Sequence, residues 1–146
     1  VTYTYANGVV HTCKSTTASE WNGAVKDRNG QQHGIKFHGS DGWIWVTRGV
    51  INASNRDILR EKLPESAKHV YVSNDHMGNF IDCVLGRREP IAPVEVAHRS
   101  ASVCHLGNIA VQTGQTLKWD PAKFEFTGGA GDPKWLTRDY RSPWSV

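Results

Sequence analysis

The first half of this 146-residue chain is a series of short β-rich runs separated by glycine turns, and the second half carries two helix patterns. Runs within 1–12 flank Asn7-Gly8, and the runs 35–38 and 43–47 flank a glycine-containing turn. Such pairs predict hairpins, because glycine and asparagine adopt the positive φ angles of tight turns. Hairpins followed by helices predict an α+β fold with a mostly antiparallel, open sheet and helices packed on one face.

The two helix patterns have clear boundaries. Asp75 is a good N-cap for a first helix, which Gly86 is expected to close. A second helix is expected over about 94–113, with Gly114 as its stop signal. The apolar residues of the first pattern recur at i, i+3, i+4, i+7 and i+8: Met77, Phe80, Ile81, Val84 and Leu85.

Weaker patterns predict shorter elements. We expect a short helix in 52–64 that ends near Pro64, a strand over 69–73, and one or two extended pieces within 117–129. Asp132 followed by Pro133 predicts a helical turn near the C-terminus. The stretch 14–32 is polar and is expected to be a loop or a ragged edge strand. The length is that of one domain, 1–146, with its own core.

Composition excludes several classes of protein. The formal charge is only +3 and the basic residues are scattered, which argues against nucleic-acid binding. No apolar stretch approaches the roughly 20 residues that span a bilayer, so we expect a soluble protein, with cytoplasm favoured over periplasm. Cys13, Cys83 and Cys104 have no CxxC spacing and predict buried, unbridged thiols. Because the only methionine is Met77, we expect that a segment before Val1 was removed.

The segment 98–110, HRSASVCHLGNIA, is dense in reactive groups. At about 100° per residue, Cys104 falls on the core side, whereas Glu95, His98 and His105 share a polar stripe. That separation excludes a Cys/His dyad. His98 and His105 are about 10 Å apart by helix rise, too far to share a metal ion without further ligands. We therefore predict no catalytic residue and no metal site here; the histidines are either solvated or hydrogen-bonded at an interface.

Known cofactor and nucleophile motifs do not occur. The sequence has no GxGxxG, no GxxxxGK[ST] and no GxSxG. The glycine-rich segment 128–131 follows no strong strand and is expected to be a flexible loop rather than a phosphate cradle. The chain itself is therefore expected to hold no cofactor.

The run Trp43-Ile44-Trp45-Val46 is apolar at every position. A strand of this kind predicts that both sheet faces are covered. We expect helices of the domain on one face and a partner on the other.

Three segments resemble the C-terminal part of the Gfo/Idh/MocA oxidoreductases, the family of glucose-fructose oxidoreductase and inositol dehydrogenase. They are HGIKFHGSDGWIWVTRG, the run from Tyr71 to Ala110 that contains HRSASVCHLGNIA, and LTRDYRSPW. The likeness is strongest to bacterial members that pair a Gly-Trp-x-Trp-Val-x-Arg-Gly strand with this helix, and it covers nearly the whole chain from about Val1.

The resemblance implies a two-domain parent enzyme. Its Rossmann domain holds NAD(P) and carries a Glu-Lys-Pro motif, and the C-terminal domain shapes the site for a sugar or polyol and mediates oligomerisation. The sequence lacks the Rossmann half and the segment with the family's catalytic histidine, so no catalytic residue is carried over. On this view Glu95, His98 and His105 face the substrate cleft or the Rossmann domain. Trp43 and Trp45 lie on a sheet face that forms a homo-oligomer.

Two other classes of function stay open. In a free-standing carbohydrate-binding module, exposed Trp21, Trp119 or Trp144 would stack on sugar rings. In a purely structural assembly domain, the protein would form a stable oligomer without responding to any ligand.

Overall fold

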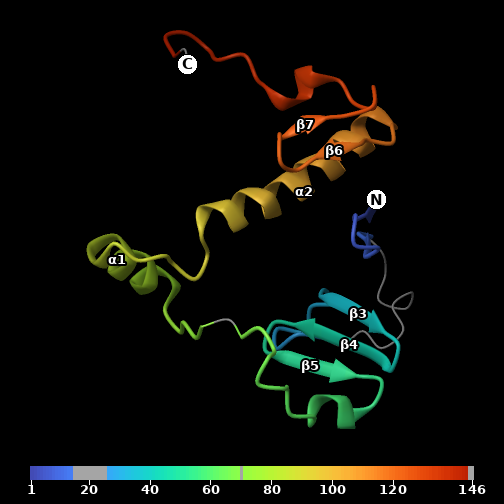
Figure 1. Ribbon diagram of the computed structural model, residues 1–146, viewed down its shortest axis with the longest axis vertical. Helices are drawn as coiled ribbons and strands as arrows, with labels where there is room; N and C mark the ends of the chain where they lie inside the picture. Colours follow the sequence, from blue (N-terminus) through green and yellow to red (C-terminus); the bar gives the residue numbers. More distant parts are fainter. Residues whose placement is uncertain (15–25, 70, 145–146) are drawn as a thin grey trace. The chain divides into compact units, whose positions relative to one another are not determined.

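The computed structural model describes residues 1–14, 26–69 and 71–144 (Figure 1). The chain forms two compact units, one of Val1–Cys13 with Val70–Val146 and one of Lys14–His69. A division into two compact units does not by itself define separate domains, so the single domain 1–146 stays a prediction. Small antiparallel sheets and two α-helices confirm the α+β class and the open sheets. The packing of helices on one sheet face stays a prediction.

The unit Lys14–His69 is built on a three-stranded antiparallel meander, β3 (Ile35–Gly39), β4 (Gly42–Thr47) and β5 (Val50–Ala53). The two-residue connection Ser40-Asp41 joins the first two strands, as the glycine turn predicts. The strand β5 was not expected. It includes Asn52 and Ala53, so the helix predicted within 52–64 is reduced to the short 3-10 helix η2 (Arg56–Leu59).

The two faces of this sheet differ in chemistry. Cross-strand pairs point to the same side, so the register separates two sets of side chains. One set, which we call the Phe37 face, includes Ile35, Phe37, Ile44, Val46, Ile51 and Ala53. The other, the tryptophan face, includes Lys36, His38, Trp43, Trp45, Thr47, Val50 and Asn52.

Burial differs between residues of the two faces. Trp45 on the tryptophan face is only 2% exposed, whereas Phe37 is 58% exposed. A polar loop explains the buried tryptophan: Asp27 accepts hydrogen bonds from the Asn29 and Gln31 amides, both at 2.8 Å, and the chain then returns to Gly34. The Cα of Gly34 lies so close to the Trp45 ring that a Cβ there would stand 2.9 Å from it.

The other unit contains both α-helices. α1 (His76–Gly86) begins at Asp75, whose carboxylate accepts a hydrogen bond from the Gly78 amide. It ends at Arg87, which takes the left-handed conformation that was expected of Gly86. α2 (Val94–Thr113) ends at Gly114 with φ 68°, as predicted.

Four shorter elements complete this unit. They are β1 (Thr2–Thr4), β2 (Val10–Thr12), β6 (Trp119–Asp120) and β7 (Glu125–Phe126), which pair as two hairpins. The 3-10 helix η3 (Pro133–Leu136) is capped by Asp132 as expected. The strand predicted over 69–73 is wrong for its described residues, because no strand pairs with them; Val70 lies outside the described residues.

Tyr3 attaches the first hairpin to α2. Its hydroxyl donates to the Val103 carbonyl at 3.0 Å, and its ring stacks on His11. A Cβ on Gly107 would collide with the Tyr3 hydroxyl. The Tyr3 side chain therefore packs against α2 at a position where the helix has a glycine.

The cysteines are unbridged, as expected, but only Cys83 is buried. The burial predicted for Cys13 and Cys104 is wrong. On α2, Gly107, one turn after Cys104, is buried because it lies against Tyr3. Cys104 itself stays exposed. Among the described residues, no helix is both long and apolar enough to cross a bilayer.

Gly34→Ala should destabilise the sheet unit more than Gly30→Ala. Both glycines have positive φ, 152° and 78°, so each alanine is strained, at about 1 kcal/mol. Only the Gly34 Cβ also meets backbone, 2.5 Å from the Val46 carbonyl oxygen; nothing lies within 4 Å of the Gly30 position. We expect a total loss of about 3 kcal/mol for Gly34→Ala in denaturant unfolding. Equal losses for the two variants would contradict the close packing.

Tyr3 should make stability fall at high pH. Burial, followed by the Cys13, Cys104 and Tyr5 side chains, raises the pKa of Tyr3 above its ordinary value of 10.0. Above that pH the unfolded chain loses the proton first, so the free energy of unfolding decreases as pH rises. The advantage of the wild type over Tyr3→Phe, about 1 kcal/mol from the hydrogen bond, should therefore shrink as the pH rises above about 10. Tyr140→Phe, at a residue 63% exposed, is the control. A pH-independent difference would refute this role.

Candidate functional site

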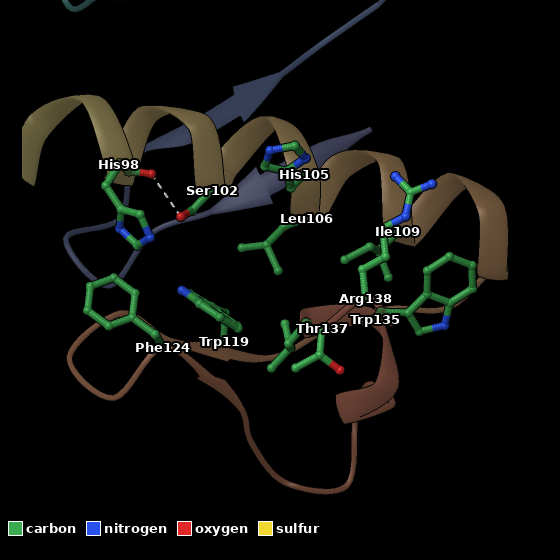
Figure 2. Close-up of a pocket in the computed structure, with 11 residues that line it drawn as sticks. His98, Ser102, His105, Leu106, Ile109, Trp119, Phe124, Trp135, Thr137 and Arg138 are labelled. Atoms are coloured by element: carbon green, nitrogen blue, oxygen red, sulfur yellow. Dashed lines mark hydrogen bonds between the residues drawn. The ribbon is translucent and has the colours of Figure 1, made fainter. Parts of the chain in front are cut away.

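A hollow of about 400 Å³ lies between α2 and the chain that follows it, from β6 to the residues after η3 (Figure 2). Its volume falls in the range of small-molecule sites. Eleven residues line it: His98, Ser102, His105, Leu106, Ile109, Trp119, Phe124, Trp135, Leu136, Thr137 and Arg138.

One stripe of α2 forms the helical wall. Its residues follow a spacing of three to four, which places them on neighbouring turns of one side of the helix. In Figure 2, His98 points toward Phe124, and Leu106 extends into the hollow. The Ser102 hydroxyl donates to the His98 carbonyl at 2.8 Å, so it is engaged by its own helix.

The opposite wall depends on the turn between β6 and β7. The Asp120 carboxylate accepts hydrogen bonds from the amides of Ala122 and Lys123, at 2.8 and 3.2 Å. This turn leads to Phe124, which has a left-handed backbone with φ 54°. The Phe124 ring meets the His98 imidazole edge-on, with ring centroids 4.8 Å apart.

Arg99 connects the two walls. Its guanidinium donates to Glu95 on the same helix at 2.7 Å and to the Pro121 carbonyl at 3.0 Å. The same group lies 5.4 Å from the centre of the Phe124 ring. Arg99 and Glu95 therefore position the turn that carries Phe124, although neither lines the hollow.

The candidate site residues from the sequence analysis do not all lie at the hollow. His98 and His105 both line the hollow, whereas Glu95 supports it through Arg99. Trp43 and Trp45 lie in the other unit, where Trp45 is buried and the Lys36 ammonium sits 4.4 Å above the Trp43 ring. Whether Trp43 and Trp45 take part in oligomer contacts stays a prediction.

Sequence analysis missed most of the wall opposite α2. Phe124, Trp135 and Arg138 come from a turn, a short 3-10 helix and an irregular segment, none of which has a periodic pattern. Asp132-Pro133 did predict the helical turn that carries Trp135. For Phe124, Asp120-Pro121 was an available signal, because this pair favours a turn. On α2, the helical spacing of Leu106 and Ile109 relative to His98 and Ser102 would have placed them on the same side.

The lining of the hollow provides groups that can bind a small molecule. Within the part of the chain that the structure describes, no three His, Cys, Asp or Glu side chains gather as metal ligands would. The hollow combines three large aromatic side chains with imidazole, hydroxyl and guanidinium groups. Such a mixture provides apolar surface for a ring and polar groups that orient it.

The starts of the two α-helices that the structure describes are poorly suited to a dinucleotide. A pyrophosphate needs unoccupied backbone amides at a helix N-terminus. At α1 the Asp75 carboxylate already accepts a hydrogen bond from the Gly78 amide. At α2 no side chain caps the first amides, but the first turn carries Glu95, an acidic residue that makes this helix start less favourable for phosphate. No step of a reaction is therefore assigned to a nucleotide held by these residues.

Comparison with known proteins identifies the family. Residues 26–146 match the family described as the oxidoreductase family, C-terminal alpha/beta domain, of the Gfo/Idh/MocA proteins. The match includes both α-helices, the three-stranded sheet and every residue that lines the hollow. Neither the comparison with curated proteins nor that with solved structures finds a match. The chain belongs to the Gfo/Idh/MocA oxidoreductase family, of which it is a C-terminal alpha/beta domain.

Proposed function

We propose that this chain is the substrate-side domain of an NAD(P)-dependent sugar or polyol oxidoreductase and is not catalytic alone. The observation that carries the proposal is the hollow beside α2, which brings His98 and His105 together with Trp119, Phe124 and Trp135. Family membership supplies the class of reaction, a hydride transfer at a hydroxyl-bearing carbon.

The chemistry of the hollow supports a hydroxylated ring as ligand. Aromatic faces pack against the C–H surface of a sugar, and imidazole nitrogens and hydroxyls exchange hydrogen bonds with its hydroxyl groups. Neither the His98 nor the His105 imidazole nitrogens hydrogen-bond to another described residue. Both rings are therefore available to a ligand.

The cofactor would be held by a Rossmann domain, because the helix starts described above do not suit a pyrophosphate. This division of labour can be tested by sequencing the gene upstream of Val1. An in-frame segment with GxGxxG and Glu-Lys-Pro would support it. A start codon or a secretion signal within a few residues would favour a free-standing module instead.

A second function, carbohydrate binding without catalysis, is favoured by Trp119, whose indole lines the hollow. Trp144 is 69% exposed but lies outside the hollow, and Trp21 lies outside the described residues. The two functions differ in their dependence on a nucleotide domain, since the free-standing module alone would bind its sugar at physiological concentration.

Homo-oligomerisation through the three-stranded sheet is part of the proposal. The Phe37 face carries Ile35 and Phe37, each 58% exposed, and Ile51, 56% exposed. Exposed apolar patches of this kind favour association. This surface is opposite the tryptophan face that the sequence suggested, and a second copy of the chain is the partner we propose for it.

Replacing both histidines should weaken substrate binding in an enzyme that contains this chain and a nucleotide domain. For His98→Ala/His105→Ala we expect KM to rise about tenfold or more, because hydrogen bonds to the substrate are lost. The chain alone should bind no NADH in calorimetry. His76→Ala, an exposed residue at the start of α1, is the control. Unchanged turnover, KM and melting temperature in the double variant would exclude this role.

Charge on the Phe37 face should prevent self-association. We expect the wild-type chain to form a dimer or larger oligomer in light scattering, and Phe37→Lys to be monomeric, since burying an unpaired ammonium is unfavourable. Val10→Lys, at a strand residue 60% exposed in the other unit, should leave the oligomer intact. A wild-type protein that stays monomeric at high concentration would show that this surface does not mediate assembly.

A further inference from the structure

Resting on the proposed function, we infer that the hollow beside α2 binds a carboxylated sugar, whose carboxylate pairs with Arg138. Of the eleven lining residues, Arg138 is permanently cationic, His98 and His105 can accept a proton, and no residue is acidic. The lining of the hollow therefore carries a positive charge in every protonation state.

Carboxylates on the elements around the hollow are engaged elsewhere. Glu95 pairs with Arg99, Asp120 accepts amides of its own turn, and Glu125 lies 3.7 Å from Lys123. Asp132 pairs with Lys134 at 2.9 Å, and the same lysine holds the pKa of that carboxyl below its usual range. Asp139 follows Arg138 in sequence but does not line the hollow.

Arg138 itself forms no ion pair or hydrogen bond with another described residue. In Figure 2 its guanidinium extends toward α2 on the side of Ile109, across the hollow from His98 and Phe124. A ligand with an anionic end at Arg138 would thus have its ring directed toward Trp119, which lies between the two ends in Figure 2. The planar fork of arginine matches a carboxylate in two parallel hydrogen bonds.

The charge count favours a carboxylate over a phosphate. At neutral pH Arg138 provides one fixed positive charge, which balances the single charge of a sugar acid. A phosphate monoester carries about −1.5 to −2 and would need a further cation, such as a protonated histidine. The inferred ligand class is therefore a sugar carrying one carboxylate.

Calorimetry on the 146-residue chain tests this inference with D-glucuronate and D-gluconate against D-glucose and D-glucose 6-phosphate. We expect the acids to bind at least about tenfold more tightly than glucose, and the difference to decrease with added salt. Arg138→Gln should remove this preference. Arg141→Gln takes away the same charge at an exposed residue outside the hollow and should leave the preference intact.

The other outcomes separate the two proposals. Equal binding of acids and glucose, unaffected by Arg138→Gln, would overturn the carboxylate inference and leave the substrate-side function standing. If glucose 6-phosphate bound most tightly, the carboxylate inference would be overturned and the ligand class would be a sugar phosphate. Binding of none of the four ligands would overturn the carboxylate inference, whereas the substrate-side function is tested separately by the His98→Ala/His105→Ala variant in an enzyme with a nucleotide domain. Near-ultraviolet circular dichroism of Arg138→Gln confirms that any loss is not due to unfolding.

Discussion

The hollow depends on Arg99, which holds the turn after β6 against α2. As an exposed pair on one helix, Glu95 and Arg99 would contribute only about 0.5 kcal/mol. The larger effect is positional, because the guanidinium also donates to the Pro121 carbonyl and covers the Phe124 ring. A charged donor on a carbonyl is worth about 1.5–3 kcal/mol. Glu95 thus fixes the direction of Arg99, and Arg99 fixes the distance between the two walls of the hollow.

The elements that sequence analysis predicted well have local causes. α2 was placed from Val94 to Thr113 because helical spacing and Gly114 are both contained in the segment itself. The hairpins follow from their glycine turns in the same way. The failures depend on distant partners: the segment 69–73 has strand residues but no neighbouring strand, and Ala53 joins β5 because Ile44 is available to pair with it. Phe124 was missed for a similar reason, since its left-handed backbone serves a contact with a helix about 25 residues earlier.

Strand alternation identifies which residues share a face but not which face is covered. Phe37 and Trp45 both lie in well-predicted strands, and the pattern alone would bury the first as readily as the second. The decision depends on Gly34, where the absence of a Cβ lets the preceding loop lie against the Trp45 ring. Asp27 sets the course of that loop through two backbone amides. A close approach between a glycine and a tryptophan eleven residues later leaves no periodic signal in the sequence.

A domain that does not itself carry out the hydride transfer, as we propose for this chain, can still decide which substrate reacts. Interactions with the non-reacting part of a substrate contribute to catalysis when they orient the reacting carbon. The proposed carboxylate contact at Arg138 lies across the hollow from His98, so a ligand held at the first is oriented relative to the second. Selectivity would then come from the irregular segment after η3, whereas α2 supplies a wall of fixed geometry. Such a segment can change its side chains without disturbing a helix, which makes it the part of the fold best suited to adjusting substrate preference.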